Sequence, residues 1–158
     1  MSDLVWTGNK DYDPVEGTGS VGVEFAGSAV TSPCPYGANI TLEQARNYTN
    51  WIVNANPELQ WNDLYYRGYY ELHITKDVLE ARYFGMPTVG TRNPLEISLG
   101  NFTVRSGENR LARPVGGGVV ESGTLKGGQT RFTNASESST LQSQRALLTM
   151  WCSLRYRE

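Results

Sequence analysis

Residues 67–84 read RGYYELHITKDVLEARYF, and this stretch decides the fold. Hydrophobic side chains take every second position on both sides of Thr75-Lys76-Asp77, namely Tyr70, Leu72 and Ile74, then Leu79, Ala81 and Tyr83. Such alternation is typical of a strand with one buried face, and a short polar turn between two such runs is typical of a hairpin. We therefore expect an antiparallel β-hairpin over residues 69–84.

A helix is expected before the hairpin. Thr41-Leu42-Glu43-Gln44 has the spacing of a capping box. Hydrophobic residues then recur at steps of three and four, at Ala45, Tyr48, Ile52 and Ala55. This spacing predicts a helix from Leu42 to Ala55 that buries the side carrying those residues. Asn56-Pro57 should end it, since a residue before proline is disfavoured in the helical conformation.

Two more segments are expected to be strands. One contains Val21, Val23, Phe25 and Ala29 at alternate positions and stops before Pro33 and Pro35, which cannot donate ladder hydrogen bonds. The other begins with Leu95, Ile97 and Leu99, continues extended from Asn101 to Arg105, and turns at Ser106–Asn109. It is expected to be a strand pair or an edge strand. The fold class is therefore α+β, with strands, a β-hairpin and one helix.

The carboxyl-terminal quarter carries weaker signals. Residues 116–128 are rich in glycine and are expected to be irregular. In the tail, Leu147, Leu148, Trp151 and Leu154 recur at helical spacing and predict an amphipathic helix, flanked by Arg145, Arg155 and Arg157. This helix can pack on its own domain or dock on a partner or a membrane surface.

Composition excludes several functions. The chain has 158 residues, which suits one domain, and a formal net charge of −2, so it offers no broad positive field to nucleic acid or anionic membranes. One His and two Cys exclude a zinc finger and a His-rich metal centre. No apolar run approaches the roughly 20 residues of a membrane span.

The compartment is left open by conflicting signals. Four N-glycosylation sequons begin at Asn39, Asn47, Asn101 and Asn134, and they have meaning only in the secretory pathway. The amino terminus, however, lacks the basic start and apolar core of a signal peptide, so we expect no targeting signal in this chain. Cys34 and Cys152 are either one disulfide or two buried thiols.

No motif assembles an active site. Residues 17–22 match the letters of a dinucleotide fingerprint but precede a strand instead of following one, and residues 118–123 lack the lysine of a phosphate-binding loop. Ser32 and Ser122 have no base positioned by the sequence, and Asp3, Asp11 and Asp13 lack the spacing of a calcium loop. We expect no catalytic residue here.

Two clusters on the hairpin are better explained by structure than by chemistry. His73 lies beside Glu71, with Glu80 and Arg82 expected on the neighbouring strand, which predicts a surface ion-pair cluster. An aromatic group near the base of the hairpin can line a ligand groove or fill a core, and we favour the core: Trp61, Tyr65, Tyr66, Tyr69, Tyr70 and Tyr83.

Three segments carry a resemblance to a known family: GVEFAGSAVTSP (22–33), NPELQWNDLYYRGYYELHITKDVLEARYFGMPT (56–88) and ENRLARPVGGGVVESGTLKGG (108–128). Together they resemble the carboxyl-terminal portion of PhoD-like metallophosphatases, the alkaline phosphatase D family, in its fungal form. The resemblance assigns residues 1–128 to part of that phosphatase domain and leaves residues 129–158 as an unmatched tail.

The resemblance implies the carboxyl-terminal part of an αββα sandwich, in which residues 21–29 and the hairpin belong to one mainly antiparallel sheet that the helix over residues 42–55 covers. It also implies a parent enzyme that cleaves phosphomonoesters and phosphodiesters at a binuclear centre of iron with calcium. The family's ligands lie in blocks upstream of Ser2, so none is carried over to Asp3, Cys34 or His73, and the expected catalytic, cofactor-binding and metal residues of this chain are none.

Two functions follow as expectations. The chain is either a fragment of a secreted phosphoesterase, inactive without its metal-binding half, or a stand-alone β-rich module that pairs with a partner chain. The partner would be the missing amino-terminal half or a second copy that associates through an exposed sheet.

Overall fold

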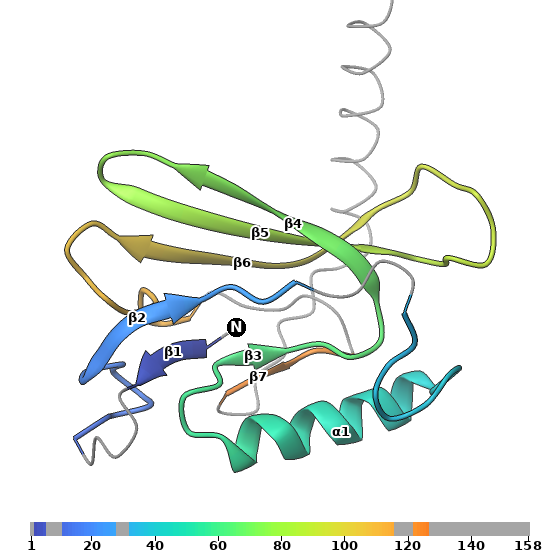
Figure 1. Cartoon of the computed structure of the whole chain (residues 1–158), viewed down its shortest axis with the longest axis horizontal. Helices are drawn as coiled ribbons and strands as arrows, with labels where there is room; N and C mark the ends of the chain where they lie inside the picture. The colour runs from blue at the N-terminus through green and yellow to red at the C-terminus, as the bar shows by residue number, and fades with distance from the viewer. Residues whose placement is uncertain (1, 6–10, 28–31, 116–121, 127–158) are drawn as a thin grey trace, which may run out of the picture.

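The computed structural model describes residues 2–5, 11–27, 32–115 and 122–126 (Figure 1). Its elements in chain order are β1 (Ser2–Val5), β2 (Ser20–Glu24), α1 (Leu42–Ala55), β3 (Trp61–Asn62), β4 (Arg67–Ile74), β5 (Val78–Met86), β6 (Ile97–Arg105) and β7 (Thr124–Leu125). Every strand pair is antiparallel, which confirms the α+β class. No helix in these ranges is long and apolar enough to span a membrane. The helix predicted in the tail lies outside the described residues.

The expected hairpin forms the largest sheet, in the order β4-β5-β6. Tyr70 pairs with Tyr83 and His73 with Glu80. The Thr75 hydroxyl fixes the turn, because it accepts hydrogen bonds from the backbone N–H groups of Asp77 (3.3 Å) and Val78 (3.0 Å). The alternating pattern therefore predicted both the hairpin and its turn correctly.

A β-bulge shifts the alternation along β6. Tyr83 pairs with Gly100 whereas Phe84 pairs with Ser98, so Leu99 is an extra residue on β6. As a result both Leu99 and Phe102 are buried, although an uninterrupted strand would send them to opposite faces. Of the two expectations for this segment, an edge strand is confirmed: β6 is one strand and lies at the end of the order β4-β5-β6.

The strands are divided over three sheets, where one was expected. β1 pairs with β2, and β3 pairs with β7. β2 ends at Glu24, before the expected Ala29, and residues 28–31 lie outside the described ranges. The expectation that residues 116–128 are wholly irregular is wrong at Thr124–Leu125, because these two residues form β7 against Trp61 and Asn62.

Helix α1 has the predicted bounds but a different buried side. The capping box between Thr41 and Gln44 is present in both directions. The fully buried residues are Ala45, Thr49 and Val53, at steps of four, whereas Tyr48 and Ala55 are exposed. Thr49 is tolerated inside because its hydroxyl lies 3.0 Å from the Ala45 carbonyl and 3.0 Å from the Ser122 carbonyl.

In Figure 1 the β4-β5-β6 sheet lies on one side, α1 on the other and the short strand pairs between them. The hydrophobic core lies between the β4-β5-β6 sheet and the short strand pairs, and α1 contacts β3 and β7. Trp61 of β3 lies at the junction, with its ring centroid 5.6 Å from Tyr83 and 5.4 Å from Phe102. The buried members of the core are Trp61, Ala81, Tyr83, Leu99, Phe102 and Leu111. The aromatic group predicted from the sequence thus divides between this core and its exposed margin.

Candidate functional site

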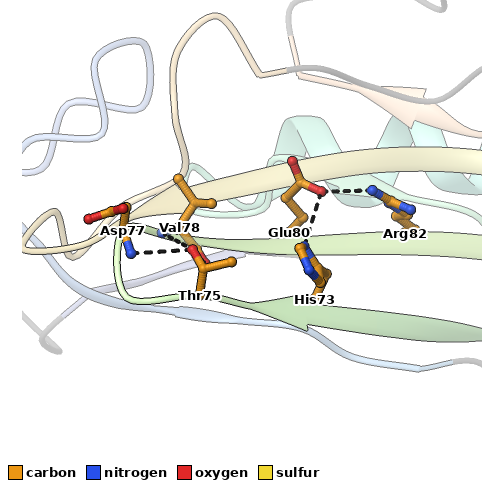
Figure 2. A network of polar contacts seen from close by, with 6 residues as sticks. All are labelled: His73, Thr75, Asp77, Val78, Glu80 and Arg82. Carbon is orange, nitrogen blue, oxygen red and sulfur yellow. Dashed lines mark hydrogen bonds and ion pairs between the residues drawn. The ribbon is translucent and has the colours of Figure 1, made fainter.

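The hairpin cluster around His73 is the first candidate site. Figure 2 shows His73 on β4 facing Glu80 on β5, with Arg82 on the other side of the Glu80 carboxylate. His73 Nδ1 lies 3.8 Å from Glu80 Oε2, and Arg82 Nη2 lies 2.9 Å from the same oxygen. An open recess on this surface is lined by Glu71, Leu72, His73 and Arg82. The predicted ion-pair cluster is therefore present.

The geometry of this cluster does not suit catalysis. The His73 side chain is 65% exposed, and its nearest charged partner is a carboxylate already bonded to Arg82. A nucleophile would need to lie within hydrogen-bond reach of the imidazole to be activated by it. Exposed pairs of this kind contribute about 0–1 kcal/mol each, so the cluster is a surface feature of the sheet.

A second polar centre, not found from the sequence, surrounds Asp63 in the loop after β3. Asp63 Oδ1 accepts the backbone N–H groups of Tyr65 (3.0 Å) and Tyr66 (2.9 Å), which fixes the turn into β4. Its Oδ2 accepts the hydroxyl of Ser122, which precedes β7. One carboxylate thus ties together segments that are distant in the chain.

The electrostatics of Asp63 follow from its position. Burial raises the pKa of its carboxyl above the ordinary value, while the bonds from Ser122, Tyr66 and Tyr65 and the charge of Arg67 oppose that rise. Ser122 is completely buried, so its hydroxyl offers no surface to a substrate. Asp63 and Ser122 therefore form a structural contact, and the reading of Ser122 as a nucleophile loses its basis.

The polar seam between α1 and β7 continues from this contact. The Thr124 hydroxyl lies 2.8 Å from Asn50 Oδ1 and 3.1 Å from the Thr49 hydroxyl. Lys126 Nζ donates to the carbonyls of Val53 (2.7 Å) and Asn56 (2.9 Å), at the carboxyl-terminal end of α1. Burial lowers the pKa of Lys126, against the charge of Glu58, which raises it. These contacts hold the helix on the short β3-β7 sheet.

The other polar residues named from the sequence do not converge. Ser32 is exposed, and Cys34 is buried in a turn closed by the Gly37 N–H on its carbonyl at 3.0 Å. Asp13 Oδ1 accepts the N–H of Val15 at 2.8 Å in its own loop. Cys152, which could pair with Cys34 in a disulfide, lies outside the described residues, as do Asn134 and the arginines of the tail.

A binuclear iron and calcium centre does not fit the side chains of the described part of the chain. Such a centre needs several oxygen and nitrogen donors around each metal. Within the ranges that the structure describes, no group of three or more His, Cys, Asp or Glu side chains is placed to hold a metal ion. The carboxylate of Asp63 also has its oxygens occupied by Ser122 and two backbone N–H groups.

The aromatic residues near the base of the hairpin fill the core rather than line a groove. Trp61 and Tyr83 are buried, Tyr70 stacks on Tyr83 with centroids 5.0 Å apart, and Tyr66 packs against the core. Tyr65 and Tyr69 remain at the exposed margin. Burial strongly raises the pKa of the Tyr83 hydroxyl, with smaller contributions from Tyr70 and Glu24.

Comparison with known proteins places this arrangement in a family. The family model described as PhoD-like phosphatase matches residues 1–83, which is more than half of the chain and includes β1 to β4, α1 and most of β5. No curated protein and no solved structure matches the chain. On the strength of the family match, the chain belongs to the PhoD-like phosphatases.

Proposed function

We propose that this chain is a scaffold portion of a fungal-type PhoD-like phosphoesterase and hydrolyses no phosphoester by itself. The proposal rests on one observation: the polar side chains of the candidate sites already bond other parts of the fold. Asp63 and Ser122 bond each other, Lys126 bonds the end of α1, and His73 faces Glu80 on an exposed strand. Groups committed to holding the fold are not available to activate water or to bind a phosphoryl group.

The proposal places the metal centre on residues that this chain does not supply. Two bridging metals, iron with calcium in the family that the sequence resembles, would activate a water and stabilise the charge on the phosphoryl oxygens. The part of this chain is to support the sheet and helix that surround such a centre. We infer that residues 1–128 form this support and that the parent enzyme is secreted.

A partner for the scaffold is favoured by the core side of the three-stranded sheet. Ile74 pairs with Leu79, and Leu79 pairs with Val104, so these three side chains form an apolar row across β4, β5 and β6. Ile74 in this row is 66% exposed, and Leu72 in the neighbouring row is 44% exposed. Apolar rows left open at the end of a sheet favour association. A metal-bearing half of the phosphatase is the partner that fits the proposal.

The test is an assay of the purified 158-residue chain with p-nitrophenyl phosphate and bis(p-nitrophenyl) phosphate. We expect no hydrolysis above the buffer rate with or without added iron and calcium, while a complete PhoD-like enzyme serves as positive control. Turnover that a chelator abolishes and added metal restores would overturn the proposal. Co-expression with a metal-bearing half should produce activity, and Ile74→Glu with Leu72→Glu should reduce it.

A stand-alone binding module is the second function, and the same exposed row supports it. The DNA sequence upstream of the codon for Met1 distinguishes the two functions. An in-frame block of the form Gly-Asp-x-His-x-x-Trp there favours the phosphatase scaffold, whereas a promoter or another gene favours the module.

A further inference from the structure

The outward side of α1 carries an aromatic patch formed by Tyr36, Tyr48 and Trp51. Trp51 is 63% exposed, although an indole is among the largest apolar groups in a protein. Tyr36, from the loop before the helix, stacks on Tyr48 with ring centroids 4.4 Å apart and planes inclined by 15°. A contiguous exposed aromatic surface is a common feature of binding sites.

A glycosylation sequon lies inside this patch. Asn47 is exposed on α1 and precedes Trp51 by four residues, a spacing that places the two Cβ atoms about 5–6 Å apart on one side of a helix. Because helical side chains lean toward the amino terminus, we expect the indole of Trp51 to lie on the side of Asn47. A sugar attached to Asn47 would therefore begin beside the exposed ring.

We propose that Asn47 carries an N-linked glycan and that its first N-acetylglucosamine packs on the indole of Trp51. The donor is a polyprenyl-pyrophosphate-linked oligosaccharide. The Asn47 amide nitrogen bonds to C1 of the sugar and loses one proton, while the pyrophosphate leaves C1 with the bonding electron pair. The apolar C–H face of a pyranose ring is suited to an aromatic surface, which explains why Trp51 is left in water in the bare chain. This inference rests on the secretion proposed above, but it does not depend on whether the chain supports phosphoester hydrolysis.

The structure also fixes when the sugar must be attached. The sequon needs the hydroxyl of Thr49, and this residue is completely buried. Its hydroxyl lies 3.0 Å from the Ser122 carbonyl and accepts from Thr124 at 3.1 Å. Within the helix the hydroxyl also lies 3.0 Å from the Ala45 carbonyl, so transfer must precede both the formation of α1 and its packing against β7.

The first experiment measures occupancy. The full chain, preceded by a secretion leader, is expressed in a eukaryotic host, and total cell and medium protein is analysed by peptide mass spectrometry. We expect N-acetylhexosamine on Asn47, its loss in Asn47→Gln, and its retention in Asn39→Gln and Asn101→Gln. Because intracellular protein is included, a variant that folds poorly is still scored. An unmodified Asn47 in the unsubstituted chain would overturn the proposal.

The second experiment tests the packing on Trp51. Trimming the glycan to one sugar should leave the melting temperature unchanged, whereas complete enzymatic removal should lower it by roughly 2–4 °C, the shift that about 1 kcal/mol produces in a chain of this size. In Trp51→Ala complete removal should cause no shift. An equal shift in both proteins, or none in either, would show that the sugar does not rest on the indole.

Discussion

The Ser122 hydroxyl donates a hydrogen bond to the Asp63 carboxylate across 59 residues of chain. This contact connects the loop after β3 with the segment that leads into β7. The same carboxylate orders the turn into β4 through the N–H groups of Tyr65 and Tyr66. Asp63 is therefore the point at which the short β3-β7 sheet, which carries α1, is joined to the entry of the hairpin.

Asp63→Asn should change the pH dependence of stability. The pKa of Asp63 is raised in the folded chain, so the folded state binds its proton more tightly than the unfolded state. The carboxyl thus favours folding most below its ordinary value of 3.8, and that contribution is lost as pH rises through the raised folded pKa. Asn mimics the protonated form, so the wild-type chain should lose stability relative to Asp63→Asn over this window.

Urea unfolding of both proteins from pH 3 to pH 8 measures the difference. Asp63→Ala is the matched control, because it removes every acceptor and should cost about 2–4 kcal/mol by leaving three donors unpaired. A constant difference between the wild type and Asp63→Asn at all pH values would contradict a raised pKa.

Gly68→Ala should destabilise the hairpin strongly. β4 approaches β5 so closely at Gly68 that an added Cβ would lie 1.8 Å from the carbonyl oxygen of Phe84. The obstructing atom belongs to the backbone, so no change of rotamer relieves the clash, and we expect a loss of about 2–3 kcal/mol or more. Chemical denaturation measures the change.

The matched control for Gly68 is Gly90→Ala. The nearest atom to its added Cβ is the Thr88 hydroxyl at 3.5 Å, an ordinary contact. The free energy of unfolding should therefore change by less than about 0.5 kcal/mol. Equal effects of the two substitutions would show that the close approach of β4 and β5 is not maintained in solution.

Lys126→Met should loosen the end of α1. Lys126 donates to two carbonyls of the last turn, at Val53 and Asn56, where the helix dipole also favours a positive charge. Since Lys126 is only partly buried, we expect a cost of about 1–2 kcal/mol. Lys76→Met in the exposed hairpin turn should be nearly neutral in the same urea titration. A loss no larger than that of Lys76→Met would contradict the capping role.

The sequence predicted those elements whose signals are local. The hairpin and its Thr75 turn follow from alternation, and the bounds of α1 follow from its cap and the proline after Asn56. The buried side of α1 was predicted wrongly because Thr49 is satisfied inside by the Ser122 carbonyl, a partner distant in the chain. Hydrophobicity alone favours Tyr48, which instead stacks on Tyr36 at the surface.

Long-range pairing explains the other differences. Two-residue strands such as β7 have no alternating pattern, and β7 exists because Thr124 pairs with Asn62. The Asp63 centre was missed for the same reason, since Asp63 and Ser122 are 59 residues apart in the chain. The His73 cluster was predicted because both of its strands belong to one hairpin, whose register the turn fixes.

His73→Gln should have almost no effect on stability. The imidazole is mostly exposed, and the Glu80 carboxylate keeps Arg82 at 2.9 Å when His73 is removed. Exposed ion pairs are also screened by salt, so we expect a change below about 0.5 kcal/mol at pH 7, in low salt and in 1 M NaCl alike. Phe102→Ala, which leaves a cavity in the core, should cost about 3–5 kcal/mol in the same assay. If this chain supports hydrolysis in complex with a metal-bearing partner, His73→Gln should leave that rate unchanged, and a tenfold loss of rate would give the His73 cluster the catalytic role that its geometry argues against.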